Sequence, residues 1–97
     1  MPNSAQNPPN LSTRVLISGK VQGVGYRYHT LHQARRLGIN GWVKNLPSGR
    51  VEAIFEGKKA AVEQMLTWCH QGSPAAVVKE VAFEYQGITG IEDFTIL

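Results

Sequence analysis

Several features are scarce in this sequence, and each scarcity excludes a class of protein. Cys69 is the single cysteine among 97 residues, which excludes an internal disulfide framework and a cysteine-based zinc site. No apolar run approaches the roughly 18 residues of a membrane-spanning helix, and the first dozen residues lack the basic and apolar regions of a secretory signal. We therefore expect a cytoplasmic protein with no membrane partner.

Charge is also scarce. Charged residues make up 18% of the chain and hydrophobic residues 42%, a composition typical of a folded domain rather than a disordered chain. Ten lysines and arginines against seven aspartates and glutamates give a net charge of +3, which favours anionic ligands. This balance alone does not indicate nucleic-acid binding, which would need the charge gathered into a patch.

The length of the chain fits one domain. Residues 1–12 contain three prolines, three asparagines and two serines, a composition that predicts a flexible arm outside the fold. We therefore place the folded domain at residues 13–97.

Hydrophobic periodicity divides this domain into strands and helices. Alternating apolar and polar residues predict strands, at 13–18, 39–46, 50–56 and 77–85. Apolar residues spaced three and four apart predict helices, at 27–37 and 58–71. The helical side chains expected to face the core are Tyr28, Leu31, Ala34, Val62, Met65, Leu66 and Cys69. Residues 94–97 are compatible with a short edge strand. Gly57 is expected to end the third strand.

The order of these elements, βαββαβ, predicts a ferredoxin-like α+β fold. We expect a four-stranded antiparallel or mixed sheet, with the short edge strand as a possible fifth, and both helices on one face. Each strand–helix–strand crossover is expected to make a parallel pair, and the middle hairpin an antiparallel one. In the last long strand, Val77, Val81, Phe83 and Tyr85 are expected to share one face.

The strongest chemical signal lies between the first strand and the first helix. Glycines at 19, 23 and 25 allow the backbone to turn so that its N–H groups converge. The N-terminus of the following helix and Arg27 add further donors suited to phosphate. Neither nucleotide-binding glycine motif fits, because no Lys-Ser or Lys-Thr pair follows and Tyr28 stands where the last glycine of G-x-G-x-x-G is required.

Two segments of the sequence resemble a known family. Residues 17–27, Ile-Ser-Gly-Lys-Val-Gln-Gly-Val-Gly-Tyr-Arg, are similar to the first signature of the acylphosphatases. The second signature is matched by residues 41–45, Gly-Trp-Val-Lys-Asn, followed by 49–51, Gly-Arg-Val, and then Gly57. The resemblance extends over about residues 13–97.

The resemblance implies hydrolysis of small-molecule acyl phosphates to a carboxylate and inorganic phosphate. By position in the motifs, Arg27 would bind the phosphoryl group and Asn45 would orient the attacking water. The backbone cradle for the phosphate would be formed by Gln22, Gly23, Val24, Gly25 and Tyr26, ending at Arg27. No metal or other cofactor is implied, and a monomer is expected.

Two other functions deserve comparison with the acylphosphatase hypothesis. RNA-recognition modules share the βαββαβ order, but residues 50–56 contain one aromatic and two carboxylates, which suits neither base stacking nor phosphate contact. The alternative we retain is a non-catalytic phosphate- or carbamoyl-phosphate-binding module of the same fold. Such a module would keep Arg27 but would have no need of Asn45.

Other polar residues carry weaker signals. His29 and His32 have a spacing that can bind a metal, but no third ligand lies nearby in the sequence, so we expect no metal site. Lys58 and Lys59 begin a helix, and they are either solvated or enlarge the positive field around the anion site.

Overall fold

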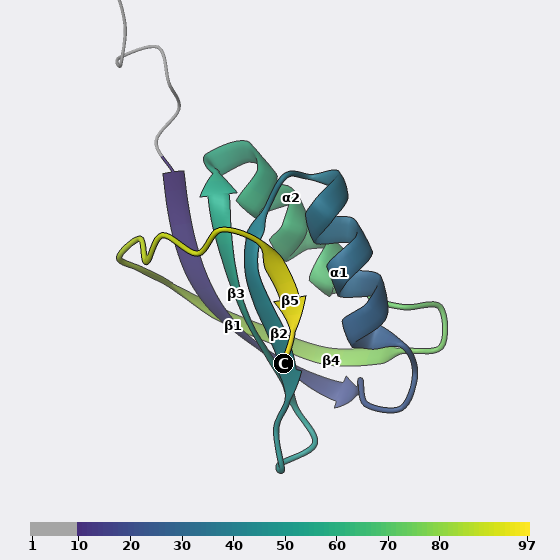
Figure 1. The fold of residues 1–97 in the computed structure, drawn as a ribbon. Coiled ribbons are helices and arrows are strands. Elements are labelled where there is room, and N and C mark those ends of the chain that lie inside the picture. The colour runs from purple at the N-terminus through teal and green to yellow at the C-terminus, as the bar shows by residue number, and fades with distance from the viewer. Residues whose placement is uncertain (1–9) are drawn as a thin grey trace, which may run out of the picture.

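The computed structural model describes residues 10–97, which form one sheet and two helices (Figure 1). In chain order the elements are β1 (Asn10–Lys20), α1 (Tyr26–Arg36), β2 (Asn40–Asn45), β3 (Val51–Lys58), α2 (Lys59–Cys69), β4 (Val77–Gln86) and β5 (Phe94–Ile96). Of the arm expected at residues 1–12, residues 10–12 belong to β1, and the others lie outside the described residues. No helix within residues 10–97 is long and apolar enough to cross a membrane.

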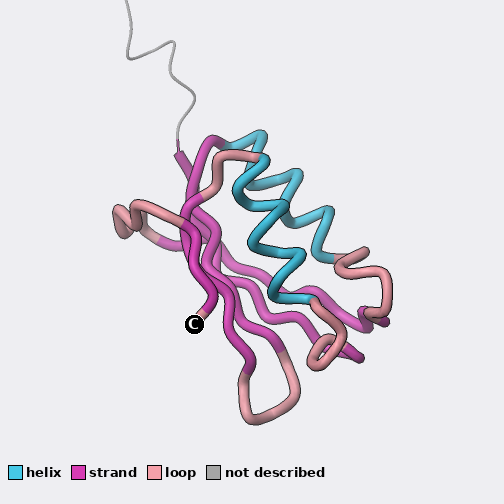
Figure 2. Tube along the Cα trace, turned by 45° about the vertical axis from the view of Figure 1, so that its right-hand side comes forward, coloured by secondary structure: helices cyan, strands magenta, loops and turns pink. Residues whose placement is uncertain are grey.

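The sheet has five strands in the order β4-β1-β3-β2-β5, and both helices lie on one of its faces (Figure 2). This arrangement confirms the ferredoxin-like α+β fold, with the short strand at its edge. The expectation of two parallel pairs was wrong, because β3 lies between β1 and β2, and β1 lies between β3 and β4. Among the strands of the described residues, β5 alone pairs in parallel, alongside β2.

Each helix buries one stripe of side chains against the sheet. The core-facing residues of α2 are the predicted Val62, Met65, Leu66 and Cys69. The prediction for α1 was partly wrong: Tyr26, Thr30 and Ala34 are buried, whereas Tyr28 is 58% exposed. Because α1 begins at Tyr26, an i, i+4, i+8 stripe faces the sheet, and the Thr30 hydroxyl donates to the Tyr26 carbonyl.

Strand β3 continues further than predicted. Gly57 does not end the strand but pairs with Leu11 of β1, and Lys58 aligns with Asn10. Lys58 and Lys59 therefore lie where β1 begins, whereas the glycine-rich loop follows the residue at which β1 ends. That separation assigns the two lysines to a solvated position rather than to the anion site.

Strand β4 contains an irregularity that the alternating pattern does not predict. Ser18 aligns with Glu80, but its neighbour Gly19 aligns with Val78, so Lys79 is an extra residue without a partner on β1. The bulge reverses the alternation, and Val77 is 62% exposed rather than sharing the core face of Val81.

The outer half of β4 is also less covered than expected. Phe83 and Tyr85 alternate as predicted, yet they are 50% and 53% exposed. Their rings contact each other edge to face, with centroids 5.7 Å apart. The reason is that β4 is an edge strand, whereas α2 lies mainly over β3 and β1, and α1 lies over β2 and β5 on the other side of the sheet's centre.

The segment between β4 and β5 connects opposite edges of the sheet and crosses β1 and β3 in the view of Figure 1. Glu56 on β3 holds this segment. Its carboxylate accepts hydrogen bonds from the backbone N–H and hydroxyl of Thr89, the N–H of Gly90 and the hydroxyl of Ser12. Burial raises the pKa of Glu56, but these hydrogen bonds outweigh burial and leave the pKa below its usual value of 4.5.

We expect Glu56→Gln to lower the free energy of unfolding by about 2 kcal/mol at neutral pH, because hydrogen bonds to a charged group are worth roughly 1.5–3 kcal/mol. The folded-state pKa is lowered, so this stabilisation is present above pH 4.5 and is lost as the pH falls through the folded-state value. Urea unfolding at pH 7 and pH 3 measures both effects. Glu63→Gln, on the exposed side of α2, is the matched control, and an equal loss in both variants would contradict the role of Glu56.

Candidate active site

The loop between β1 and α1 presents backbone donors to solvent. Gly23 and Gly25 have φ angles of 73° and 77°, which side-chain-bearing residues rarely adopt. Gly25 is the N-cap of α1, no side chain caps this end, and the first turn contains no acidic residue. The first N–H groups of α1 therefore remain available to an external anion.

His29 fixes the shape of this loop, a role that the sequence did not suggest. Both the backbone N–H and the Nδ1 atom of His29 lie 3.0 Å from the carbonyl oxygen of Gly25. Because a carbonyl oxygen only accepts, Nδ1 carries the proton in this pair. The Tyr28 ring lies between the two histidines, with its centroid 5.6 Å from that of His29 and 4.4 Å from that of His32.

Tyr26 contributes to the loop through its backbone, because its side chain is buried. The hydroxyl donates to the carbonyl of Cys69 at 2.8 Å, and the ring lies 5.8 Å from that of Trp68. Burial raises the pKa of Tyr26 far above its usual range and raises the pKa of the Cys69 thiol to about 12. Cys69 is therefore an un-ionised core residue at neutral pH, as its position on the apolar stripe predicts.

Arg27 lies in the first turn of α1, directly after the glycine-rich loop. Its side chain is partly exposed and forms no hydrogen bond or ion pair with any residue in the range 10–97. It borders a hollow of about 180 Å³ that is also lined by Gly23, Gly25, Tyr28 and Ile96. The presence of Ile96 was not predicted, because it comes from β5 at the opposite end of the sequence.

Asn45 is the last residue of β2, as expected, and its side-chain oxygen is in an unusual state. Oδ1 is buried, yet it has no hydrogen-bond partner among the described residues. A buried acceptor without a partner costs free energy, so its presence in a native protein calls for an explanation, such as a catalytic role or a bound water. Oδ1 of Asn45 has an unused capacity to accept a hydrogen bond, which a ligand or water molecule can meet once the atoms that cover it move.

Gln22 joins the glycine-rich loop to the segment that follows Asn45. Its Nε2 donates to the carbonyls of Leu46 and Arg50, each at 2.9 Å. These two residues close the predicted tight turn of the hairpin, where Leu46 N–H also donates to Arg50. Both N–H groups of the Gln22 side chain are therefore engaged in holding the turn, which leaves the backbone N–H as the donor that Gln22 can offer to an anion. The neighbouring Val24 packs against the core.

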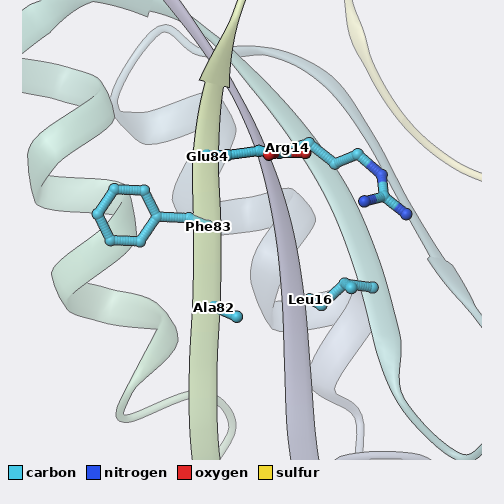
Figure 3. Close-up of a pocket in the computed structure, with 5 residues that line it drawn as sticks. All are labelled: Arg14, Leu16, Ala82, Phe83 and Glu84. Carbon is cyan, nitrogen blue, oxygen red and sulfur yellow. The ribbon is translucent and has the colours of Figure 1, made fainter.

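A different hollow, of about 170 Å³, lies between β1 and β4 (Figure 3). Arg14 and Leu16 point to one side of these strands and Phe83 to the other. Arg14 is already paired with Glu52 on β3, with 2.6 Å between Nε and Oε2. Within residues 10–97, the charge of Arg14 is therefore already compensated by a carboxylate, unlike that of Arg27.

The fold and the loop define a ferredoxin-like α+β domain with a glycine-rich turn at its first strand–helix junction, where the N-terminus of α1 has no side-chain cap. A family model of the acylphosphatase domain matches residues 13–96. An acylphosphatase of Trichormus variabilis is 51% identical over 96 residues, which are 99% of this chain and 95% of that relative. The chain therefore belongs to the acylphosphatase family.

Solved structures agree with this assignment. The crystal structure of acylphosphatase from Bacillus subtilis is similar with a TM-score of 0.88 and 34% identity, covering 90% of this chain and 98% of that one. An acylphosphatase structure from Coxiella burnetii is similar with a TM-score of 0.90 and 33% identity over 100% of both chains.

Proposed function

We propose that this protein is an acylphosphatase in which Arg27 and the backbone N–H groups of residues 22–27 bind the phosphoryl group and Asn45 orients the attacking water. Membership of the family supports the hydrolysis of acyl phosphates and favours an enzyme over a non-catalytic binding module. The observation that carries the proposed mechanism is the buried, unpartnered Oδ1 of Asn45, next in the chain to a residue that Gln22 contacts.

The chemistry of the substrate explains why so few side chains are needed. The leaving group of an acyl phosphate is a carboxylate, a weak base that departs without protonation by a general acid. Catalysis therefore reduces to positioning the reactants and stabilising charge on the phosphoryl oxygens.

The proposed phosphate site meets that requirement with fixed positive groups. The N-terminus of α1 directs N–H donors and the positive end of the helix dipole toward the anion. The planar guanidinium of Arg27 can form two parallel hydrogen bonds to phosphoryl oxygens. Because no acceptor within residues 10–97 pairs with Arg27, binding does not require any ion pair of this range to break.

Asn45 would act on the water rather than on the phosphate. Its amide is too weak a base to remove a proton, but Oδ1 can accept a hydrogen bond and hold the water oxygen in line with the phosphorus–oxygen bond that breaks. The proton of the water could then pass to a phosphoryl oxygen. This division of tasks assigns binding to Arg27 and turnover to Asn45.

The other parts of the proposal concern location and partners. We infer a cytoplasmic monomer, in agreement with the free, buried thiol of Cys69. We also infer that nucleic acid is not its ligand. RNA-recognition modules stack bases on exposed aromatics of the sheet, whereas Phe55 of β3 is fully buried against Phe94.

Hydrolysis of benzoyl phosphate, followed by absorbance with and without excess EDTA, tests the proposed function. We expect equal rates, because amide, guanidinium and backbone N–H groups supply the whole site and none of them needs a metal. A rate lost in EDTA and restored by Mg²⁺ would contradict the mechanism. A folded protein that binds phosphate without turnover would instead be the binding module.

A further inference from the structure

A second group of cations lies beside the phosphate site. Lys20, Arg50 and Lys79 come from three different strands or turns and line one hollow of about 580 Å³, together with the hydroxyl-bearing Ser18 and Ser48. Cavities of about 300–1,000 Å³ are typical of small-molecule sites. We call this feature the basic hollow.

Two backbone features bring these cations together. The bulge in β4 makes Lys79 the extra residue of the strand, and bulges commonly redirect a side chain. Gly19, with a φ angle of 126°, lets β1 and β4 approach so closely that a Cβ at this position would lie 2.2 Å from the carbonyl oxygen of Val77. Both features lie at the ends of β1 and β4 that carry Lys20 and Lys79. This backbone geometry therefore allows the two lysines to line the same hollow.

The charges of the basic hollow are not neutralised within the described part of the chain. None of the three cations, Lys20, Arg50 and Lys79, forms an ion pair with a carboxylate in residues 10–97. Glu80, which lies beside the bulge, pairs with none of them. Among the described residues, the guanidinium of Arg50 has one hydrogen-bond partner, the Ser48 hydroxyl oxygen, which lies 3.2 Å from Nε. Three neighbouring cations repel one another, and a bound anion would relieve that repulsion.

The basic hollow is connected to the proposed phosphate site at two points. Lys20 directly precedes the loop that forms the phosphate cradle. The carbonyl of Arg50 accepts a hydrogen bond that Gln22 of the cradle donates. The two hollows share no lining residue, so one substrate would bind both only with an acyl part long enough to extend from the cradle to these cations.

We propose that the basic hollow binds a second anionic group, a carboxylate or a phosphate, on the acyl part of the substrate. This inference rests on the proposed function and specifies its substrate class: acyl phosphates that carry a negative charge at the far end of the acyl chain. The second anion would contribute mainly to KM and to the rate of association, because it binds away from the reacting phosphorus.

Succinyl phosphate and butyryl phosphate form a matched pair of probes, since a carboxylate in one replaces a methyl group in the other. We expect the wild-type protein to prefer succinyl phosphate in kcat/KM, and the preference to fall as salt rises from 0.05 to 0.5 M because exposed charges are screened. Lys79→Gln is expected to reduce the preference by about fivefold, the upper range for an exposed ion pair. Lys20→Gln combined with Lys79→Gln should abolish it.

The controls separate this inference from the proposed function. Lys59→Gln removes the same charge at the start of α2, away from the cradle, and should leave the preference unchanged. Turnover of butyryl phosphate reports the proposed function alone, and we expect Lys79→Gln to change it less than twofold. Equal kcat/KM for the two probes in the wild type, or the same loss in Lys59→Gln as in Lys79→Gln, would overturn the basic hollow as a substrate site.

Discussion

Arg27→Ala is expected to lower the rate of benzoyl phosphate hydrolysis by at least about a thousandfold. An arginine that neutralises charge in phosphoryl transfer contributes about 10³–10⁵ to the rate, and Arg27 is the unpaired guanidinium next to the glycine-rich loop. Affinity for inorganic phosphate should fall with it, by about a hundredfold, because charge-assisted hydrogen bonds are lost. Initial rates and phosphate inhibition constants measure the two effects.

Two further variants show whether the guanidinium itself is responsible. Arg27→Lys should recover little activity, since an ammonium is a point charge that cannot form the paired hydrogen bonds of the planar fork. Arg36→Ala removes the same group from the exposed end of the same helix, and its rate should match that of the wild type. Near-normal turnover in Arg27→Ala would remove Arg27 from the mechanism.

Asn45→Ala is expected to separate binding from turnover. Because the amide is assigned to the water, phosphate inhibition should stay within about twofold of the wild type while kcat falls by about 10²–10³, the range for the loss of one well-placed catalytic hydrogen-bonding group. The same substitution removes an acceptor that has no partner in the free protein. We therefore expect the free energy of unfolding to remain equal or to increase, which a purely structural residue would not show.

Asn40→Ala, at the other end of β2, is the matched control for this experiment. It should retain full turnover. If Asn45→Ala kept both its rate and its phosphate affinity, the water would have to be positioned by another group. If both were lost together in a stably folded protein, Asn45 would belong to phosphate binding instead.

Local patterns predicted most of the fold. The stripe on α2 and the turn at residues 46–49 depend on neighbouring residues alone, and the structure confirms both. The face of α1 was harder to predict, because Tyr26 and Tyr28 are chemically equivalent choices for a core position. Only the sheet, together with the Cys69 carbonyl that accepts from the Tyr26 hydroxyl, decides between them.

The features that were missed depend on contacts between distant segments. The bulge at Lys79 left no trace in the sequence, since Val77 and Val78 are both apolar and either could face the core. The Gln22 contacts join residues 24 and 28 positions apart. The same holds for the candidate site. The sequence motifs predicted Arg27 and Asn45, but only the structure shows that neither side chain has a hydrogen-bond partner among the described residues.

The central position of β1 also affects the order of events during synthesis. Strand β1 leaves the ribosome first, yet the Thr13 hydroxyl bonds to the carbonyl of Glu84, 71 positions later. At translation rates of about 5–20 residues per second, the edge of β1 that pairs with β4 has no partner strand for several seconds. During that interval its N–H and C=O groups and the apolar Val15 and Ile17 are exposed together, which is the condition for wrong pairing between nascent chains.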